Sequence, residues 1–240
     1  MICYQKSEDR IQKPDYQKPD SLSSVFCILC SVFCLLVVYQ SHAAPHDIDK
    51  LLVKLRHDDP KVRLSAVEEL GRIGDDDSMR ALMSVIENQG EDWKIQIRAV
   101  KLLAEIKNPR AVDLLIRILD DPFFSYDCPA LKWNAALALG NFKGHSKVAD
   151  VLIDALTDKT LYVREAAIQS LGEIGSRKAV PYLIFALNDK SFAIKISAIM
   201  ALGKIGDESA IPFVKRVLDN DADPHIRDEA AKALKRLNEN

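Results

Sequence analysis

Residues 163–175 read Val-Arg-Glu-Ala-Ala-Ile-Gln-Ser-Leu-Gly-Glu-Ile-Gly, and residues 194–206 read Ile-Lys-Ile-Ser-Ala-Ile-Met-Ala-Leu-Gly-Lys-Ile-Gly. The same pattern occurs at residues 62–74, and degenerate copies occupy residues 95–107, 131–143 and 226–238. An alanine anchors the middle of each copy, and successive anchors lie 31 to 36 residues apart: Ala66, Ala99, Ala135, Ala167, Ala198 and Ala230. A period of this length indicates stacked helical units.

Each copy has the apolar spacing of an amphipathic helix. Apolar residues recur at its first, fifth, ninth and twelfth positions, which in one copy are Val163, Ala167, Leu171 and Ile174. This spacing forms one stripe along an α-helix. Three of the six copies end in a glycine pair, and in a fourth the second glycine, Gly144, is displaced by one place. We expect the first glycine to let a neighbouring helix approach closely, and the second to adopt the left-handed conformation of a helix C-cap.

Shorter amphipathic segments lie before and between the copies and predict a second set of helices. No alternating strand pattern is present, so the sequence predicts an all-α fold of six stacked helical hairpins. The second set occupies residues 51–55, 81–86, 111–119, 148–156, 179–187 and 210–218.

The repeated motif, Val-Arg-x2-Ala-x3-Leu-Gly-x-Ile-Gly followed by Ala-x-Pro-x-Leu, resembles HEAT repeats. It is most similar to the short HEAT-like type of phycobilisome lyases, and the resemblance covers residues 46–240. It implies a right-handed α-solenoid of about six hairpins. It also implies an inter-repeat ladder of acids and bases, which maps onto Asp158 with Arg164, Asp189 with Lys195, and Asp221 with Arg227.

The N-terminal part, residues 1–43, reads as a targeting segment. Residues 25–39 carry no charge, and Ser41 and Ala43 supply the small residues that precede a signal-peptide cleavage site. The sequence therefore predicts cleavage near Ala43 and export to the periplasm or the extracellular space. The segment before this stretch is long and has no net charge, which is atypical of a signal peptide. The alternative is that residues 25–39 form a single transmembrane anchor.

Charge and residue spacing argue against several classes of activity. A formal net charge of −2 disfavours nucleic-acid binding. Two rows of residues, one position before and three positions after each anchoring alanine, are expected to face solvent, and neither row is basic. The histidines lack metal-ligand spacing, and the His-Glu dipeptides of HEAT-type deoxyhypusine hydroxylases are absent from the sequence. We therefore predict no catalytic residue, no cofactor and no metal site, and interpret Cys128 as an inert thiol.

The third repeat is lengthened by the segment 120–129, which is rich in aromatic residues. Phe123, Phe124 and Tyr126 lie within four residues of one another, and Trp133 follows on the next predicted helix. Exposed aromatic clusters mark interfaces, so these four residues form a candidate partner-binding patch. The alternative is that Phe123, Phe124 and Trp133 fold back and fill the space that the longer repeat creates.

Taken together, the sequence favours an exported, non-catalytic scaffold whose partner is another protein. The alternative is a HEAT-like enzyme or chaperone similar to the phycobilisome lyases, or an oxidoreductase by the same family analogy. Repeat arrays of one fold serve many roles, so the motif predicts the architecture and leaves the choice between these functions open.

Overall fold

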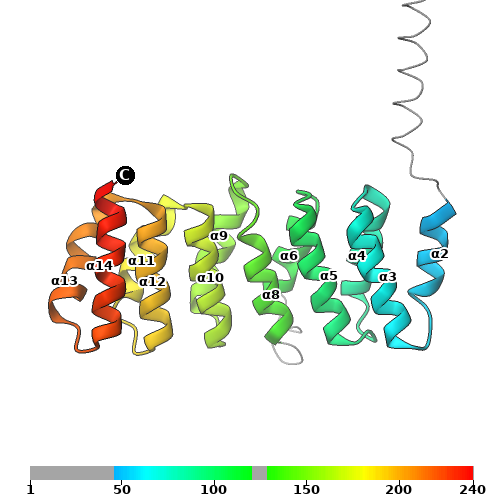
Figure 1. Ribbon diagram of the computed structural model, residues 1–240, viewed down its shortest axis with the longest axis horizontal. Coiled ribbons are helices and arrows are strands. Elements are labelled where there is room, and N and C mark those ends of the chain that lie inside the picture. Colours follow the sequence, from blue (N-terminus) through cyan, green and yellow to red (C-terminus); the bar gives the residue numbers. More distant parts are fainter. Residues whose placement is uncertain (1–45, 121–128, 240) are drawn as a thin grey trace, which may run out of the picture. The chain divides into compact units, whose positions relative to one another are not determined.

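The computed structural model describes residues 46–120 and 129–239, and Ile48–Asn240 forms one compact unit. Within these residues every regular element is helical, and the α-helices form six consecutive pairs (Figure 1). We call the first helix of a pair an A helix and the second a B helix. The A helices are α2 (His46–Lys54), α4 (Asp76–Glu87), α6 (Ala111–Asp120), α9 (Ser146–Asp154), α11 (Val180–Ala186) and α13 (Ile211–Asn220). The B helices are α3 (Pro60–Ile73), α5 (Trp93–Ile106), α8 (Pro129–Leu139), α10 (Leu161–Ile174), α12 (Phe192–Ile205) and α14 (Pro224–Glu239).

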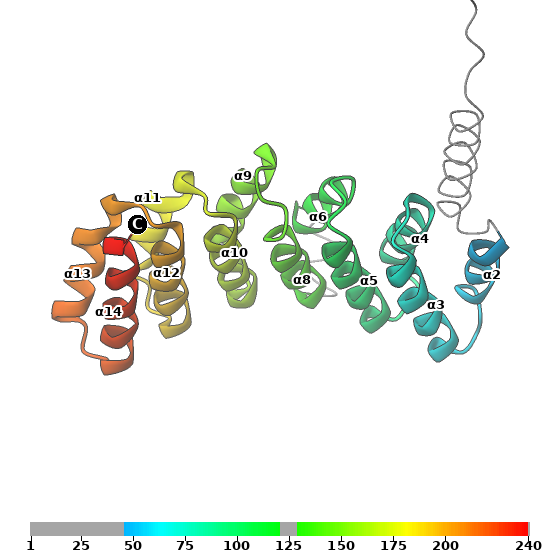
Figure 2. The ribbon, with the colours of Figure 1, turned by 45° about the horizontal axis from the view of Figure 1, so that its top comes forward.

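The pairs stack in chain order, which confirms the predicted α-solenoid. Each B helix packs against the B helix of the next repeat, and two views show the B helices as one continuous row with the A helices behind it (Figures 1 and 2). Short 3-10 turns accompany three A helices, at Ala155–Thr157, Arg177–Ala179 and Glu208–Ala210. Among these elements no helix is both long and apolar enough to cross a membrane. The predicted targeting segment, residues 1–43, lies outside the described residues.

The core runs along the solenoid between the two rows of helices. All six anchoring alanines have no exposed surface, and the leucines four residues after them are fully buried in five repeats. Burial of one leucine side chain contributes about 1.5–3 kcal/mol, so this single row is a large part of the driving force for stacking. The five leucines are Leu70, Leu103, Leu139, Leu171 and Leu202.

Three of the four glycine pairs have the two roles that the sequence predicts, whereas Gly144 lies beyond the end of α8 and does not cap it. A Cβ atom on Gly172 would lie 2.9 Å from the Cα atom of Ala201, so the two B helices are closer there than a side chain allows. Gly175 caps α10 in the left-handed region with φ 70°. α5 ends in the same way, but at Lys107 with φ 55°, which is the one non-glycine residue with positive φ among those described.

The helix α8 is shorter than the sequence predicts. We expected it to continue through residue 143, but it ends at Leu139. The N–H groups of Gly140, Asn141 and Phe142 donate to carbonyl oxygens three residues back, at 3.0 to 3.2 Å, which tightens the chain into turns. Phe142 is thereby buried. Glycine and asparagine are poor helix formers, and the burial of Phe142 favours the turn over a further helical turn.

Among the ion pairs that connect neighbouring repeats, three join a basic residue on one B helix to an acid just before the next B helix. The bases come from α3, α8 and α12, and the N–O distance is 2.9 Å in each pair. The pairs are Arg63–Glu91, Lys132–Asp158 and Lys195–Asp221.

The expected pairing of each acid with the base six residues later is wrong. Arg164 donates to the backbone carbonyl oxygen of Asp158 at 2.9 Å, while the Asp158 carboxylate accepts from Lys132 of the preceding repeat. The carboxylate also accepts from the N–H of Thr160 at 2.7 Å, which turns it away from Arg164. The contradicted side-chain pairs are Asp158 with Arg164, Asp189 with Lys195, and Asp221 with Arg227.

These pairs change the acidity of the carboxyl groups. The hydrogen bond from Lys195 holds the pKa of Asp221 below its usual value, and the N–H of Asp223 acts in the same direction. At Asp158 burial raises the pKa, but hydrogen bonds from Lys132 and Thr160 outweigh burial and lower it. The charged form of each acid is therefore stabilised by the neighbouring repeat.

Candidate protein-binding surface

The side of the B-helix row that faces solvent is formed by the residues two positions before and two positions after each anchoring alanine. None of these twelve residues is buried. The preceding row is Leu64, Ile97, Trp133, Glu165, Ile196 and Asp228, and the following row is Glu68, Lys101, Leu137, Gln169, Met200 and Lys232.

One of the two rows that we expected to face solvent is instead buried. The residues three positions after the alanines pack against the preceding B helix, where the glycines allow close contact. Five of the six are buried: Leu102, Ala138, Ser170, Ala201 and Ala233. The positions of the glycines could have indicated this burial, because a row of residues that packs against the glycines of the neighbouring helix cannot also face solvent.

Apolar side chains gather on the solvent side of the three central B helices, α8, α10 and α12. Five of these are large and exposed: Trp133 (40%), Leu161 (37%), Tyr162 (65%), Phe192 (47%) and Met200 (39%). Leu137 and Ile196 are half-buried beside them. We call these seven residues the apolar face. Exposed apolar groups scattered singly are ordinary, but a cluster over adjacent elements is typical of an interaction site.

Two aromatic rings from neighbouring repeats meet on this face. The ring centroids of Trp133 and Tyr162 are 6.3 Å apart, with the planes tilted by 47°. Aromatic pairs at this separation attract each other weakly, so the contact holds both rings at the surface in a defined position. Trp133 therefore does not fold back into the core, and that alternative is wrong for this residue.

Grooves run between the B helices on the same side. The groove between α10 and α12 has a volume of about 420 Å³. Phe192, Ile196 and Met200 line one wall, and Glu165 and Gln169 line the other. A smaller groove of about 230 Å³ separates α5 from α8 and includes Leu137. Such depressions suit side chains that project from a partner.

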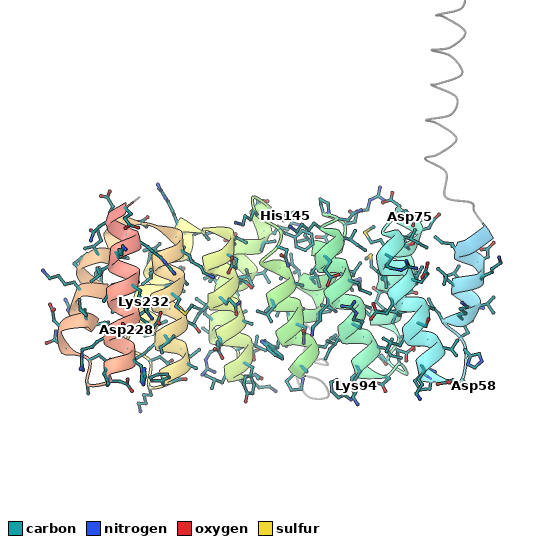
Figure 3. All side chains as sticks on the ribbon, viewed as in Figure 1. Asp58, Asp75, Lys94, His145, Asp228 and Lys232 are labelled. Atoms are coloured by element: carbon teal, nitrogen blue, oxygen red, sulfur yellow. The ribbon has the colours of Figure 1, made fainter. Side chains whose placement is uncertain are left out.

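Charged residues flank the apolar face at both ends of the row, and on the N-terminal side they lie among the exposed apolar residues Leu64 (38%) and Trp93 (51%). Towards the N-terminus, Arg98 binds Glu68 at 2.6 Å. Towards the C-terminus, Lys232 binds Asp228 at 2.7 Å and Glu229 at 2.8 Å, and these acids raise the pKa of Lys232 to about 12. Figure 3 shows Asp228 and Lys232 together on α14. An apolar centre with a polar rim is the usual composition of a protein interface.

The four residues of the predicted patch have different outcomes. Trp133 lies on the apolar face, whereas Phe123, Phe124 and Tyr126 fall in the segment 121–128, outside the described residues. The sequence did not single out Tyr162, Phe192, Ile196 or Met200. Counting positions from the anchoring alanines would have found Ile196 and Met200, because they occupy the same two rows as Trp133 and Leu137.

Residues that could act as metal ligands or catalytic groups are few on the part of the chain that the structure covers. No group of three or more His, Cys, Asp or Glu residues there has the geometry to hold a metal ion. His145 is the N-cap of α9, and His225 lies in the first turn of α14, so both sit at helix ends as predicted. Cys128 falls in the segment that is not described.

The sequence profile for HEAT repeats matches residues 48–126, 88–171, 123–193 and 184–240. These overlapping matches span the whole solenoid. The chain belongs to the HEAT-repeat family.

Two curated relatives are named phycocyanobilin lyase subunit alpha. The protein from Microchaete diplosiphon is 32% identical over 113 residues, which are 45% of this chain and 38% of the relative. The protein from Synechococcus elongatus is 44% identical over 80 residues, which are 31% of this chain and 28% of the relative. The match thus spans less than half the length of either relative.

Solved structures of similar shape include one lyase assembly and one designed protein. The complex of CpcE and CpcF of phycocyanin lyase from Nostoc sp. has 25% identity and a TM-score of 0.50, covering 83% of this chain and 68% of that one. A designed armadillo repeat protein in complex with the peptide (KR)4 has 17% identity and a TM-score of 0.53, covering 80% and 99%, and shares the fold. The chain is thus a HEAT-repeat scaffold related to phycocyanin lyase.

Proposed function

We propose that this protein is a non-catalytic scaffold that binds a protein partner through the apolar face. The observation that carries the proposal is the clustering of Trp133, Tyr162, Phe192 and Met200 on the solvent side of three successive B helices. Large aromatic and methionine side chains dominate the energetics of interfaces, especially where polar groups surround them.

The solenoid itself suits this role. A stable interface covers roughly 800 Å² on each partner, which requires side chains from several elements held in fixed relative positions. The buried alanines and leucines fix the spacing of the B helices, and the ion pairs between repeats add to it. The partner therefore meets a surface that is already ordered, which lowers the entropic cost of binding.

The test compares two triple variants in affinity capture from an extract of the organism that makes the protein. In the first, Trp133→Ser, Phe192→Ser and Met200→Ser remove three anchors of the apolar face. In the second, Tyr182→Ser, Phe185→Ser and Phe213→Ser remove exposed aromatic residues of the A helices α11 and α13. We expect the first variant to lose a specific partner at least about tenfold, since single anchors often contribute more than 1 kcal/mol. Equal capture by the first variant and the wild type would reject the apolar face.

A second candidate function is a role with an open-chain tetrapyrrole, and the named relatives favour it. The lyase complex has 25% identity to this chain and a comparable fold. If the protein handles such a pigment, purified protein mixed with phycocyanobilin will change the pigment's absorption spectrum. An unchanged spectrum at micromolar protein would exclude this second role and leave the scaffold proposal intact.

We also propose that the scaffold is exported, with cleavage near Ala43. The support is the uncharged stretch at residues 25–39 followed by the small residues Ser41 and Ala43. N-terminal sequencing of the mature protein is expected to begin at Ala44. An intact N-terminus on protein recovered with membranes would favour the alternative, a transmembrane anchor at residues 25–39.

A further inference from the structure

A cavity of about 770 Å³ lies where α8 ends and opens between α8 and α10. Its walls include Leu137 of α8, the turn at residues 140–145, and Gln169 of α10. It occupies the place where the repeat pattern fails, because α8 stops at Leu139 whereas α10 and α12 continue through the corresponding turn. Cavities of roughly 300–1,000 Å³ are the usual size of sites for small molecules.

Two lysines on the cavity wall have side chains that are available to bind a ligand. Lys107 and Lys143 both line the cavity and are exposed, and neither side chain forms an ion pair or a hydrogen bond with any residue that the structure describes. The one acid on the wall, Glu173, is paired with Lys204 of the next repeat. The cavity therefore has an excess of positive charge that no neighbouring side chain balances.

His145, the residue just before α9, adds a further polar group at the same wall. No side chain caps this nine-residue helix, whose N-cap is His145 (labelled in Figure 3). The Nδ1 atom of His145 is buried and has no hydrogen-bond partner. Buried polar atoms are normally hydrogen-bonded, so this ring nitrogen on the cavity wall is a further candidate contact for a polar ligand.

Part of the remaining wall is apolar, beside the polar residues Asn141 and Gln169. Leu137, Pro109 and Phe142 line the cavity beside the charged groups. A fully inorganic anion would leave these side chains without contacts, whereas an anion attached to a hydrocarbon body would bury them.

We propose that this cavity binds a small organic anion, with its carboxylate between Lys107, Lys143 and His145, and its apolar body against Leu137 and Phe142. The site does not depend on the proposed protein partner. Leu137 and Gln169 border both the cavity and the solvent side of the B-helix row, so an occupied cavity would lie next to the apolar face.

The experiment measures binding of 2-naphthoate to the full-length protein by isothermal titration calorimetry. The matched uncharged probe is 2-naphthalenemethanol, and inorganic phosphate tests the charge alone. We expect naphthoate to bind at least about fivefold more tightly than the alcohol, and phosphate to compete poorly. Lys143→Gln and Lys107→Gln should each weaken naphthoate binding about two- to fivefold, in line with the strength of exposed charge pairs.

The control is Lys215→Gln, which removes the same charge from the exposed side of α13. It should leave naphthoate binding unchanged, and circular dichroism should show the same helix content in all three variants. Equal affinity for naphthoate and the alcohol would overturn the proposal. Unchanged naphthoate affinity in the folded Lys143→Gln variant would also overturn it. So would phosphate that binds as tightly as naphthoate, or naphthoate that does not bind at millimolar concentration.

Discussion

At the scale of single residues, the spacing between repeats is set by missing side chains. Gly172 faces Ala201 and Gly203 faces Ala233, and a Cβ on either glycine would lie within 3.0 Å of the facing Cα. Since the obstacle is backbone, a rotamer change cannot relieve it. Small residues on both sides of the contact thus fix how closely successive B helices approach.

Gly172→Ala should lower the free energy of unfolding by about 1–2 kcal/mol, because overpacking outweighs the better helix propensity of alanine. Urea denaturation followed by circular dichroism measures the effect. The control is Gly90→Ala in the loop before α5, where the new Cβ would meet only the Asn88 side chain at 3.5 Å and little change is expected. A stabilised Gly172→Ala protein would show that the helices are not in close contact there.

A substitution at Lys107 should change the free energy of unfolding in the opposite direction. It holds φ 55° at the end of α5, a conformation that glycine adopts freely and that costs other residues about 1–2 kcal/mol. Lys107→Gly should therefore raise the free energy of unfolding by about 0.5–1 kcal/mol, after allowance for the greater entropy of unfolded glycine. A thermal melt that moves downward would contradict the backbone assignment.

At the scale of helices, the sequence predicted which segments are helical more reliably than where they end. Five of the six B helices follow the repeated copies, because the apolar period and the closing glycine or polar cap agree. α8 departs because Phe142 is buried in a turn, which depends on contacts with other helices and has no local signal. The predicted acid–base ladder shares Asp158, Lys195 and Asp221 with the observed ion pairs, but the partners differ. The base six residues after the acid binds the acid's backbone carbonyl oxygen, whereas the carboxylate binds a lysine of the preceding repeat.

The ladder between repeats predicts a pH dependence. The pKa of Asp221 is lowered in the folded state by Lys195, so its contribution is present above the unfolded pKa of about 3.9 and is lost as pH falls through the folded pKa. Asp221→Asn should thus be less stable than the wild type at pH 7, and the difference should shrink as the pH falls below about 4. Asp219→Asn, an exposed neighbour on α13, is the control. A difference that stays constant with pH would contradict the pairing.

At the scale of the whole molecule, the candidate surface could be predicted only in part. The sequence identified Trp133, because an aromatic residue near an irregular repeat stands out. It did not identify Tyr162, Phe192, Ile196 or Met200, because an apolar residue on a helix is read as core until the buried side is known. The buried side became clear from the glycine contacts, which place the solvent-facing rows two residues from each anchoring alanine.

The most direct test of the apolar face is photo-crosslinking from a single position. A photoreactive residue replaces Gln169, which lies exposed on α10 between Leu137 and Met200 in the same row, or replaces Lys215 on α13 as the matched control. We predict that position 169 gives one discrete crosslinked partner in the native extract, that position 215 does not, and that Trp133→Ser with Met200→Ser abolishes the product. Crosslinking of the same partner from position 215, or an undiminished product in the double variant, would contradict the account.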